Sequence, residues 1–138
     1  MADWRGDHYK ASDESQSTYW LRLMFISEEG NDLFLGKAIP RYWLRDGQTV
    51  TIRNAATYFG PMSMEIRSAV SQGTITMVLR PPTRNLPKNM YARFRHPDGR
   101  KMTSVTVNGK TWGNFDVDRE LVKLPPLKEK TTIVAKYR

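Results

Sequence analysis

From residue 48 onward, apolar side chains recur at every second position, which is the spacing of a β-strand with one buried face. Successive side chains on a strand point to opposite sides, so this alternation predicts strands that each present one apolar face to a core. The apolar positions of four such segments are Val50 and Ile52; Met62, Met64, Ile66 and Val70; Ile75, Met77 and Leu79; and Met90, Ala92 and Phe94.

Glycine, proline and asparagine separate these segments at short intervals. Gln72-Gly73 predicts a tight turn joining two strands, and Asn108-Gly109 is the strongest short hairpin signal in the chain. The stretch 81–87 contains three prolines and cannot sit inside a sheet, so we expect it to cross between two sheets. Short strands over 121–124 and 131–137 complete the pattern. We therefore predict an all-β fold, a mostly antiparallel β-sandwich.

The region before residue 48 is less regular. The apolar run 19–26 continues through a polar turn into 33–36, which favours a strand–turn–strand unit, with a short helix through the first run as the alternative. Pro40 and the later Asp46-Gly47 predict one short helical turn near residues 40–45, anchored by Trp43 and Leu44. Residues 1–18 are polar and predict a flexible leader, which leaves 19–138 as a single domain.

Composition excludes several classes of function. The 138-residue chain suits one domain, and the lack of cysteine removes disulfides, thiolate metal sites and cysteine catalysis. No window approaches the roughly 18 apolar residues of a membrane span, so we expect no membrane partner. The first residues lack the apolar stretch of a signal peptide, and we expect any export signal to lie outside this chain.

Catalytic motifs are missing as well. The two histidines, His8 and His96, lie far apart in the sequence without metal-ligand spacing, and there is no nucleophile elbow, P-loop or dinucleotide fingerprint. Carboxylates that could pair as in glycoside hydrolysis occur only in polar turns, where solvated side chains are the default. These are Glu28 and Glu29, and Asp116, Asp118 and Glu120. We expect no catalytic residue, no metal and no cofactor.

The formal net charge of +8 favours contact with an acidic partner, although a solvated basic surface is the plainer interpretation. If neighbouring strands pair in order, the outward positions form one basic face with an aromatic member: Arg53, Arg67, Arg80, Tyr91, Arg93 and Arg95. Such a face is typical of single-stranded nucleic-acid binding, which we keep as the alternative function. Thr51, Ser63, Glu65, Thr74 and Thr76 interrupt it and argue against a nucleic-acid partner.

Fifteen aromatic residues offer another mode of binding, because planar rings on a β-surface stack against sugar rings (4 Trp, 6 Tyr and 5 Phe). Tyr58 and Trp112 lie near turns, where loops meet at the ends of a sandwich. Each could bind a ligand at the surface or pack against the core, and the sequence leaves both alternatives open. Phe59 and Trp43 favour core packing. The candidate carbohydrate-binding residues are Tyr58, Trp112, Tyr91 and Arg93.

Two blocks of sequence resemble a known group of proteins. The first is Ile39-Pro40-Arg41-Tyr42-Trp43-Leu44-Arg45-Asp46-Gly47, and the second is Ala55-Ala56-Thr57-Tyr58-Phe59-Gly60-Pro61. With His96-Pro97-Asp98-Gly99, Val105-Thr106-Val107-Asn108-Gly109 and the aromatic Trp112, they resemble the C-terminal β-sandwich of large bacterial glycoside-hydrolase-like proteins. In those proteins the sandwich follows an (α/α)6 barrel, and the resemblance spans about residues 20–138.

This resemblance implies a role without chemistry of its own. The catalytic carboxylates of such proteins belong to the barrel, so none can be transferred to this chain. The resemblance implies a non-catalytic accessory domain that supports a neighbouring catalytic barrel and contacts a polysaccharide or oligosaccharide. It also implies a secreted or periplasmic location if the domain is attached to a glycosidase.

Overall fold

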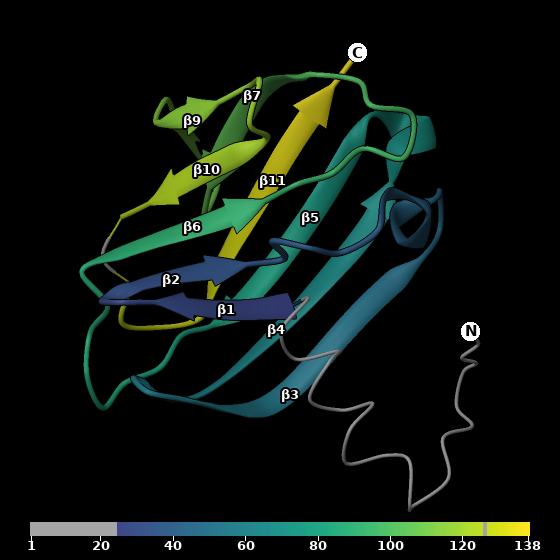
Figure 1. The fold of residues 1–138 in the computed structure, drawn as a ribbon. Helices are drawn as coiled ribbons and strands as arrows, with labels where there is room; N and C mark the ends of the chain where they lie inside the picture. The colour runs from purple at the N-terminus through teal and green to yellow at the C-terminus, as the bar shows by residue number, and fades with distance from the viewer. Residues whose placement is uncertain (1–24, 126) are drawn as a thin grey trace, which may run out of the picture.

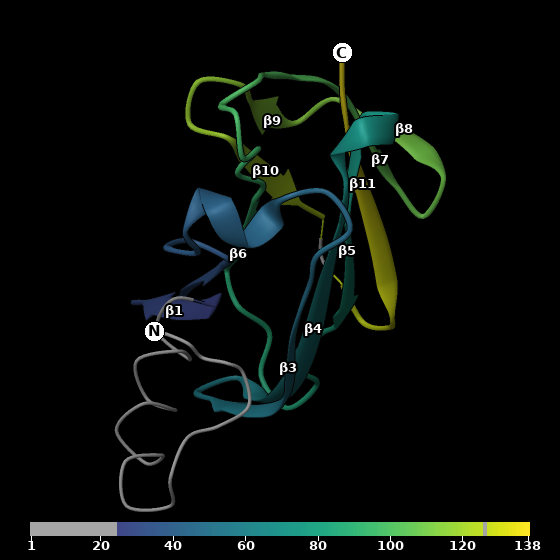
Figure 2. The same cartoon turned by 90° about the vertical axis from the view of Figure 1, so that its right-hand side faces the viewer.

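The computed structural model describes residues 25–125 and 127–138, and they form a two-layered, all-β sandwich (Figures 1 and 2). The expected polar leader at 1–18 and the start of the first apolar run, 19–24, lie outside the described residues. The all-β, mostly antiparallel fold predicted from the alternation is confirmed.

One layer is a six-stranded sheet in the order β3-β4-β5-β11-β7-β8. Its strands are β3 (Thr49–Thr57), β4 (Gly60–Ala69), β5 (Thr74–Arg80), β11 (Thr131–Tyr137), β7 (Met102–Val107) and β8 (Lys110–Trp112). All neighbours in it are antiparallel. The predicted hairpin between β4 and β5 is present, but its turn is a short 3-10 helix, η2 (Val70–Gln72), ended by Gly73 at φ +78°.

The other layer is a five-stranded sheet in the order β1-β2-β6-β10-β9. Its strands are β1 (Ile26–Glu29), β2 (Asp32–Leu35), β6 (Asn89–Arg93), β10 (Leu121–Leu124) and β9 (Phe115–Asp116). A strand–turn–strand unit is present as the β1–β2 hairpin, but β1 begins only at Ile26 and covers residues 27–29, which the sequence assigned to the turn. The pair β2–β6 is parallel, in contrast to all others. The proline-rich stretch connects β5 in one sheet to β6 in the other, as predicted.

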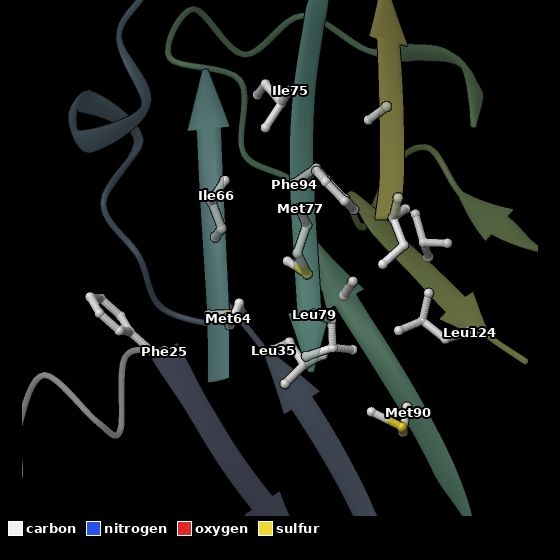
Figure 3. Packing of buried hydrophobic residues seen from close by; sticks show 14 of the residues in the cluster. Phe25, Leu35, Met64, Ile66, Ile75, Met77, Leu79, Met90, Phe94 and Leu124 are labelled. Atoms are coloured by element: carbon white, nitrogen blue, oxygen red, sulfur yellow. The ribbon is translucent and has the colours of Figure 1, made fainter. Parts of the chain in front are cut away.

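The hydrophobic core lies between the two sheets (Figure 3). The inward positions predicted from the alternation on β4, β5 and β6 are buried, and Phe94 just beyond β6 is completely enclosed. Val50 and Ile52 on the edge strand β3 are only partly buried, because that strand has a neighbour on one side alone. Because the core lies between the layers, the outer face of each sheet carries the side chains that can meet a ligand.

The expected helical turn is the 3-10 helix η1 (Arg41–Leu44), which follows Pro40. Leu44 is fully buried, and Trp43 packs edge-on against Phe25 with ring centroids 6.2 Å apart. The Asn108-Gly109 hairpin is also confirmed: both residues have positive φ, +50° and +82°, as the tight turn between β7 and β8 requires.

Candidate aromatic and basic site on the five-stranded sheet

An aromatic pair stands on the outer face of the five-stranded sheet. The parallel register of β2 and β6 sets Phe34 directly beside Tyr91. Their neighbours Leu33, Leu35 and Met90 point into the core, so the two rings must project outward. The rings stack with centroids 4.9 Å apart and planes at 17° to each other. Each ring thus holds the other in a fixed orientation.

One side of this pair is covered. The ammonium group of Lys37, in the loop after β2, lies 4.7 Å from the centroid of the Phe34 ring. The same group forms an ion pair with Glu29 on β1. The cation and its carboxylate partner therefore close the Phe34 side, and the opposite side, beyond Tyr91, is where a ligand has room.

Beyond Tyr91 the surface is hollowed. On β10, Lys123 is the cross-strand neighbour of Tyr91, and the β9–β10 hairpin rises beside it at the sheet edge. The hollow has a volume of about 200 Å³ and is lined by Tyr91, Asn114, Phe115, Asp116, Arg119, Leu121 and Lys123. Enclosed small-molecule sites have roughly 300–1,000 Å³, so this is a shallow surface site that suits part of an extended ligand.

The polar groups of the hollow include both hydrogen-bond donors and acceptors. The Asp116 carboxylate accepts a bond from the Arg119 backbone N–H at 3.1 Å, and the Arg119 guanidinium lies 3.7 Å from its other oxygen. Asn114 adds an amide, and Lys123 adds an ammonium group. A surface with one aromatic face and mixed donors and acceptors can hold a ligand that is apolar on one side and rich in hydroxyl groups at its rim.

Arg93 extends this site along β6. Arg93 follows Tyr91 by two positions on the strand, so both side chains lie on the same face. On β10, Leu121 is the cross-strand neighbour of Arg93. Its Nη1 donates to the Lys37 carbonyl at 2.9 Å, while Nε and Nη2 both donate to the Arg119 carbonyl at 3.3 Å. The guanidinium is thus held between the loop after β2 and the β9–β10 hairpin.

The structure brings together only two of the four residues that the sequence proposed. Tyr91 and Arg93 share the outer face described above. Tyr58 lies in the β3–β4 turn, 73% exposed, where its backbone N–H donates to Glu28 at 2.6 Å. Trp112 belongs to β8 of the six-stranded sheet, at the end of the sandwich away from the β3–β4 turn (Figure 2), and it is not among the residues that line the hollow.

Trp112, for which the sequence left binding and packing open, packs. Its ring is partly buried against the core, and its Nε1–H donates to the Lys123 carbonyl of β10 at 2.8 Å. The side chain therefore links β8, an edge strand of the six-stranded sheet, to β10 of the other sheet. Phe59 is buried, as expected from the sequence, and Trp43 is partly buried.

The single basic face expected from the sequence does not exist. Arg53, Arg67 and Arg80 belong to the six-stranded sheet, whereas Tyr91 and Arg93 belong to the five-stranded sheet. A single face would require β6 to lie in the same sheet as β3, β4 and β5. The proline-rich crossover instead carries β6 into the other layer, which places the two basic groups on different surfaces.

Sequence reasoning missed Phe34, Lys37, Arg119 and Lys123. A local signal existed for Phe34, because Leu33 and Leu35 flank it with inward apolar side chains. No local signal shows that β2 pairs with β6, and that pairing is what makes Phe34 part of a site.

The carboxylates considered for catalysis have structural partners. Asp118 pairs with Lys101 at 2.7 Å, and this hydrogen-bonded cation lowers the pKa of the Asp118 carboxyl, the opposite of what a general acid needs. Glu120 pairs with Arg41, Glu29 with Lys37, and Glu28 accepts from Tyr58. Within 25–125 and 127–138, no group of three or more His, Asp or Glu side chains is arranged to hold a metal ion.

A second polar cluster lies where η1, the segment after β6 and the C-terminal strand meet. Arg41 bonds the Glu120 carboxylate and the His96 carbonyl, and the His96 ring lies 4.7 Å from that of Tyr137. Burial raises the pKa of Tyr137 and lowers that of His96, so both side chains are neutral near pH 7. His96 and Tyr137 are buried and Glu120 is largely so, and the cluster is a structural joint.

The described residues contain no helix long and apolar enough to cross a membrane. Comparison of the chain with protein-family models and with curated proteins finds no match.

Proposed function

We propose that this chain is a non-catalytic accessory domain of a glycoside-hydrolase-like protein and that it contacts carbohydrate through the outer face of its five-stranded sheet. The observation that carries the proposal is the geometry of Tyr91. One face of its ring is fixed by Phe34, and the other borders a shallow hollow with mixed donors and acceptors. A sugar ring offers the matching surface, an apolar C–H face with hydroxyl groups at its edge.

Mixed charge in the hollow favours carbohydrate over nucleic acid. A groove for single-stranded nucleic acid is positively charged along its length and offers exposed rings for successive bases. Here the Phe34 ring is covered on one side by Lys37 and on the other by Tyr91. Asp116 adds a carboxylate that accepts hydrogen bonds from hydroxyl groups, which sugars carry around the whole ring.

The accessory part of the proposal rests on the sequence resemblance and on the carboxylates. Each acidic side chain that could have served glycoside hydrolysis is engaged with a cation or a backbone N–H. The domain would then contribute substrate contact and support, and a neighbouring barrel would contribute the chemistry.

Isothermal titration calorimetry of the chain against neutral and acidic oligosaccharides tests the carbohydrate contact. Tyr91→Ala should weaken binding by roughly fivefold to tenfold, which corresponds to the ~1–1.5 kcal/mol of an aromatic contact. Tyr58→Ala is the matched control, since Tyr58 is an exposed tyrosine remote from the hollow, and it should leave binding unchanged.

Flat titrations across the whole panel would exclude the carbohydrate contact. Binding to single-stranded DNA that falls steeply with salt, without any response to sugars, would replace it with the nucleic-acid alternative.

A further inference from the structure

The cations around the hollow outnumber the carboxylates. Arg93, Arg119 and Lys123 lie on or beside it, and Asp116 is the carboxylate among its lining residues. Arg119 already offsets that carboxylate, with its side chain at 3.7 Å and its backbone N–H at 3.1 Å. Within the described part of the chain, neither Arg93 nor Lys123 forms an ion pair. Two positive charges therefore face solvent beside Tyr91 without a counter-ion from the described residues.

Sheet register fixes where these two charges stand. Lys123 is directly opposite Tyr91, and Leu121 is directly opposite Arg93, so the four side chains form the corners of one patch. Diagonal partners of an antiparallel pair have Cα atoms about 7–8 Å apart, which long side chains bridge easily. Arg93 and Lys123 can thus reach one group of a ligand whose ring lies against Tyr91.

Arg93 is prepared to receive an anion. A guanidinium has five N–H donors, and the three bonds to backbone carbonyls leave one donor on each Nη atom. Two donors on adjacent nitrogens are the arrangement that binds a carboxylate or sulfate in a bidentate manner. Because the carbonyl partners already fix the side chain, little rotational freedom remains to be lost on binding.

The neighbourhood of Arg93 is also electropositive. The pKa of Arg95 is lowered mainly by burial, and the positive charges of Arg41 and Arg93 lower it further, while Glu120 acts in the opposite direction. An incoming anion would relieve this repulsion between like charges.

We propose that the carbohydrate bound at this site is acidic, with Arg93 and Lys123 receiving its carboxylate or sulfate group while its ring rests on Tyr91. The inference rests on the proposed function, since it names the class of sugar that the same site takes. It predicts selection by charge among sugars of the same backbone.

The test is a set of calorimetric titrations at low salt with three probes: oligogalacturonate, the same oligomer after reduction of its carboxyl groups, and a sulfated galactan oligomer. We expect an acidic probe to bind about tenfold or more tightly than the reduced one, as a charge-assisted hydrogen bond implies. The stronger acidic probe identifies the anion as carboxylate or sulfate.

Lys123→Met should remove most of this preference and leave binding of the reduced oligomer unchanged. Arg93→Lys keeps the charge but loses the paired donors, and it should also reduce the preference. Arg80→Met, on the exposed surface of the six-stranded sheet, removes the same charge elsewhere and should have no effect. Thermal unfolding of each variant verifies that it is folded; Lys123 is exposed, and its side chain forms no ion pair with the described residues that its replacement would break.

The outcomes separate the two proposals. Equal binding of the acidic and the reduced oligomers would overturn the inference and leave the carbohydrate contact standing. A preference that survives Lys123→Met and Arg93→Lys in folded protein would also overturn it. Binding to none of the probes, nor to any neutral sugar, would remove the proposed function itself.

Discussion

Arg41 and Glu120, which are 79 residues apart in the sequence, form a two-bond ion pair with N–O distances of 2.8 Å and 2.7 Å. The pair joins η1 to the start of β10, next to the candidate site. Glu120 adopts a left-handed backbone at φ +60°, a conformation that costs a non-glycine residue about 1–2 kcal/mol. The ion pair stabilises the fold by holding this residue in place.

Replacement of Glu120 by glutamine should lower the free energy of unfolding by about 1–3 kcal/mol, because the largely buried carboxylate is lost and Arg41 keeps a charge without its partner. Asp118→Asn is the control, since the Asp118–Lys101 pair is exposed, and the solvent screens such a pair so that its loss should change stability little. Urea unfolding of both variants measures the difference. Equal effects would mean that the Arg41 pair is worth no more than a surface contact.

Gly73 ends η2 at φ +78°, and a Cβ atom there would lie 2.8 Å from the Tyr137 carbonyl oxygen. Gly73→Ala should therefore be destabilising for two reasons. Alanine in a left-handed backbone costs about 1–2 kcal/mol, and the clash of its Cβ with β11 costs a further ~1–3 kcal/mol. Gly99→Ala isolates the first term, since Gly99 has φ +72° and open space around it. Thermal unfolding should give a clearly larger loss for Gly73→Ala; similar losses would contradict the clash.

The strands could be predicted from the sequence because their signal is local. Met62, Met64 and Ile66 alternate with polar neighbours, and burial of one face requires that pattern. The same reasoning placed Tyr91 and Arg93 on an outer face. It could not place their neighbours, because the layer that receives β6 depends on the path of the proline-rich crossover.

The remaining parts of the site depend on contacts between distant segments. Phe34 meets Tyr91 only because β2 and β6 pair in parallel, and a parallel pair leaves no turn signal between its strands. Trp112 follows a hairpin turn and so suggested an exposed loop. Its position was decided instead by a partner on another strand, the Lys123 carbonyl.

The Tyr137 hydroxyl is buried and finds no hydrogen-bond partner among the described residues. Such a group costs about 1–3 kcal/mol in desolvation, so Tyr137→Phe should leave the free energy of unfolding unchanged or raise it. Ser68→Ala is the contrasting variant: the Ser68 hydroxyl donates to the Leu44 carbonyl at 2.6 Å, and its loss should cost about 1 kcal/mol. Chemical unfolding compares them, and destabilisation by Tyr137→Phe would reveal a partner for the hydroxyl.

His96 predicts a pH dependence of stability in a narrow window. His96 is only 2% exposed. Its Nδ1 accepts a hydrogen bond from the Asp98 backbone N–H at 3.0 Å, which requires that this nitrogen carry no proton. Burial is the main reason that its pKa is lowered; Arg100 and Arg41 act in the same direction, while Asp98 and Glu120 oppose it. Protonation therefore disfavours the folded state.

The direction of this pH dependence follows from the number of protons that the folded and unfolded chains bind. With a folded pKa below the unfolded value of about 6.5, the unfolded chain binds more protons as the pH falls, so stability is full above about pH 7.5 and declines through pH 6.5. The slope from this one group is at most ~1.4 kcal/mol per pH unit. Urea unfolding of the wild type at about pH 7.5, 6.5 and 5.5 should show this decline, above the range in which carboxylates titrate.

His96→Gln supplies the comparison, because glutamine does not titrate and the variant retains His8 and every carboxylate. At pH 7.5 the variant should be less stable than the wild type, because glutamine lacks the ring contact with Tyr137. Its stability should change little between pH 7.5 and 5.5. If the unfolding free energy of His96→Gln still fell with pH as steeply as that of the wild type, the pH dependence would come from another group and not from His96.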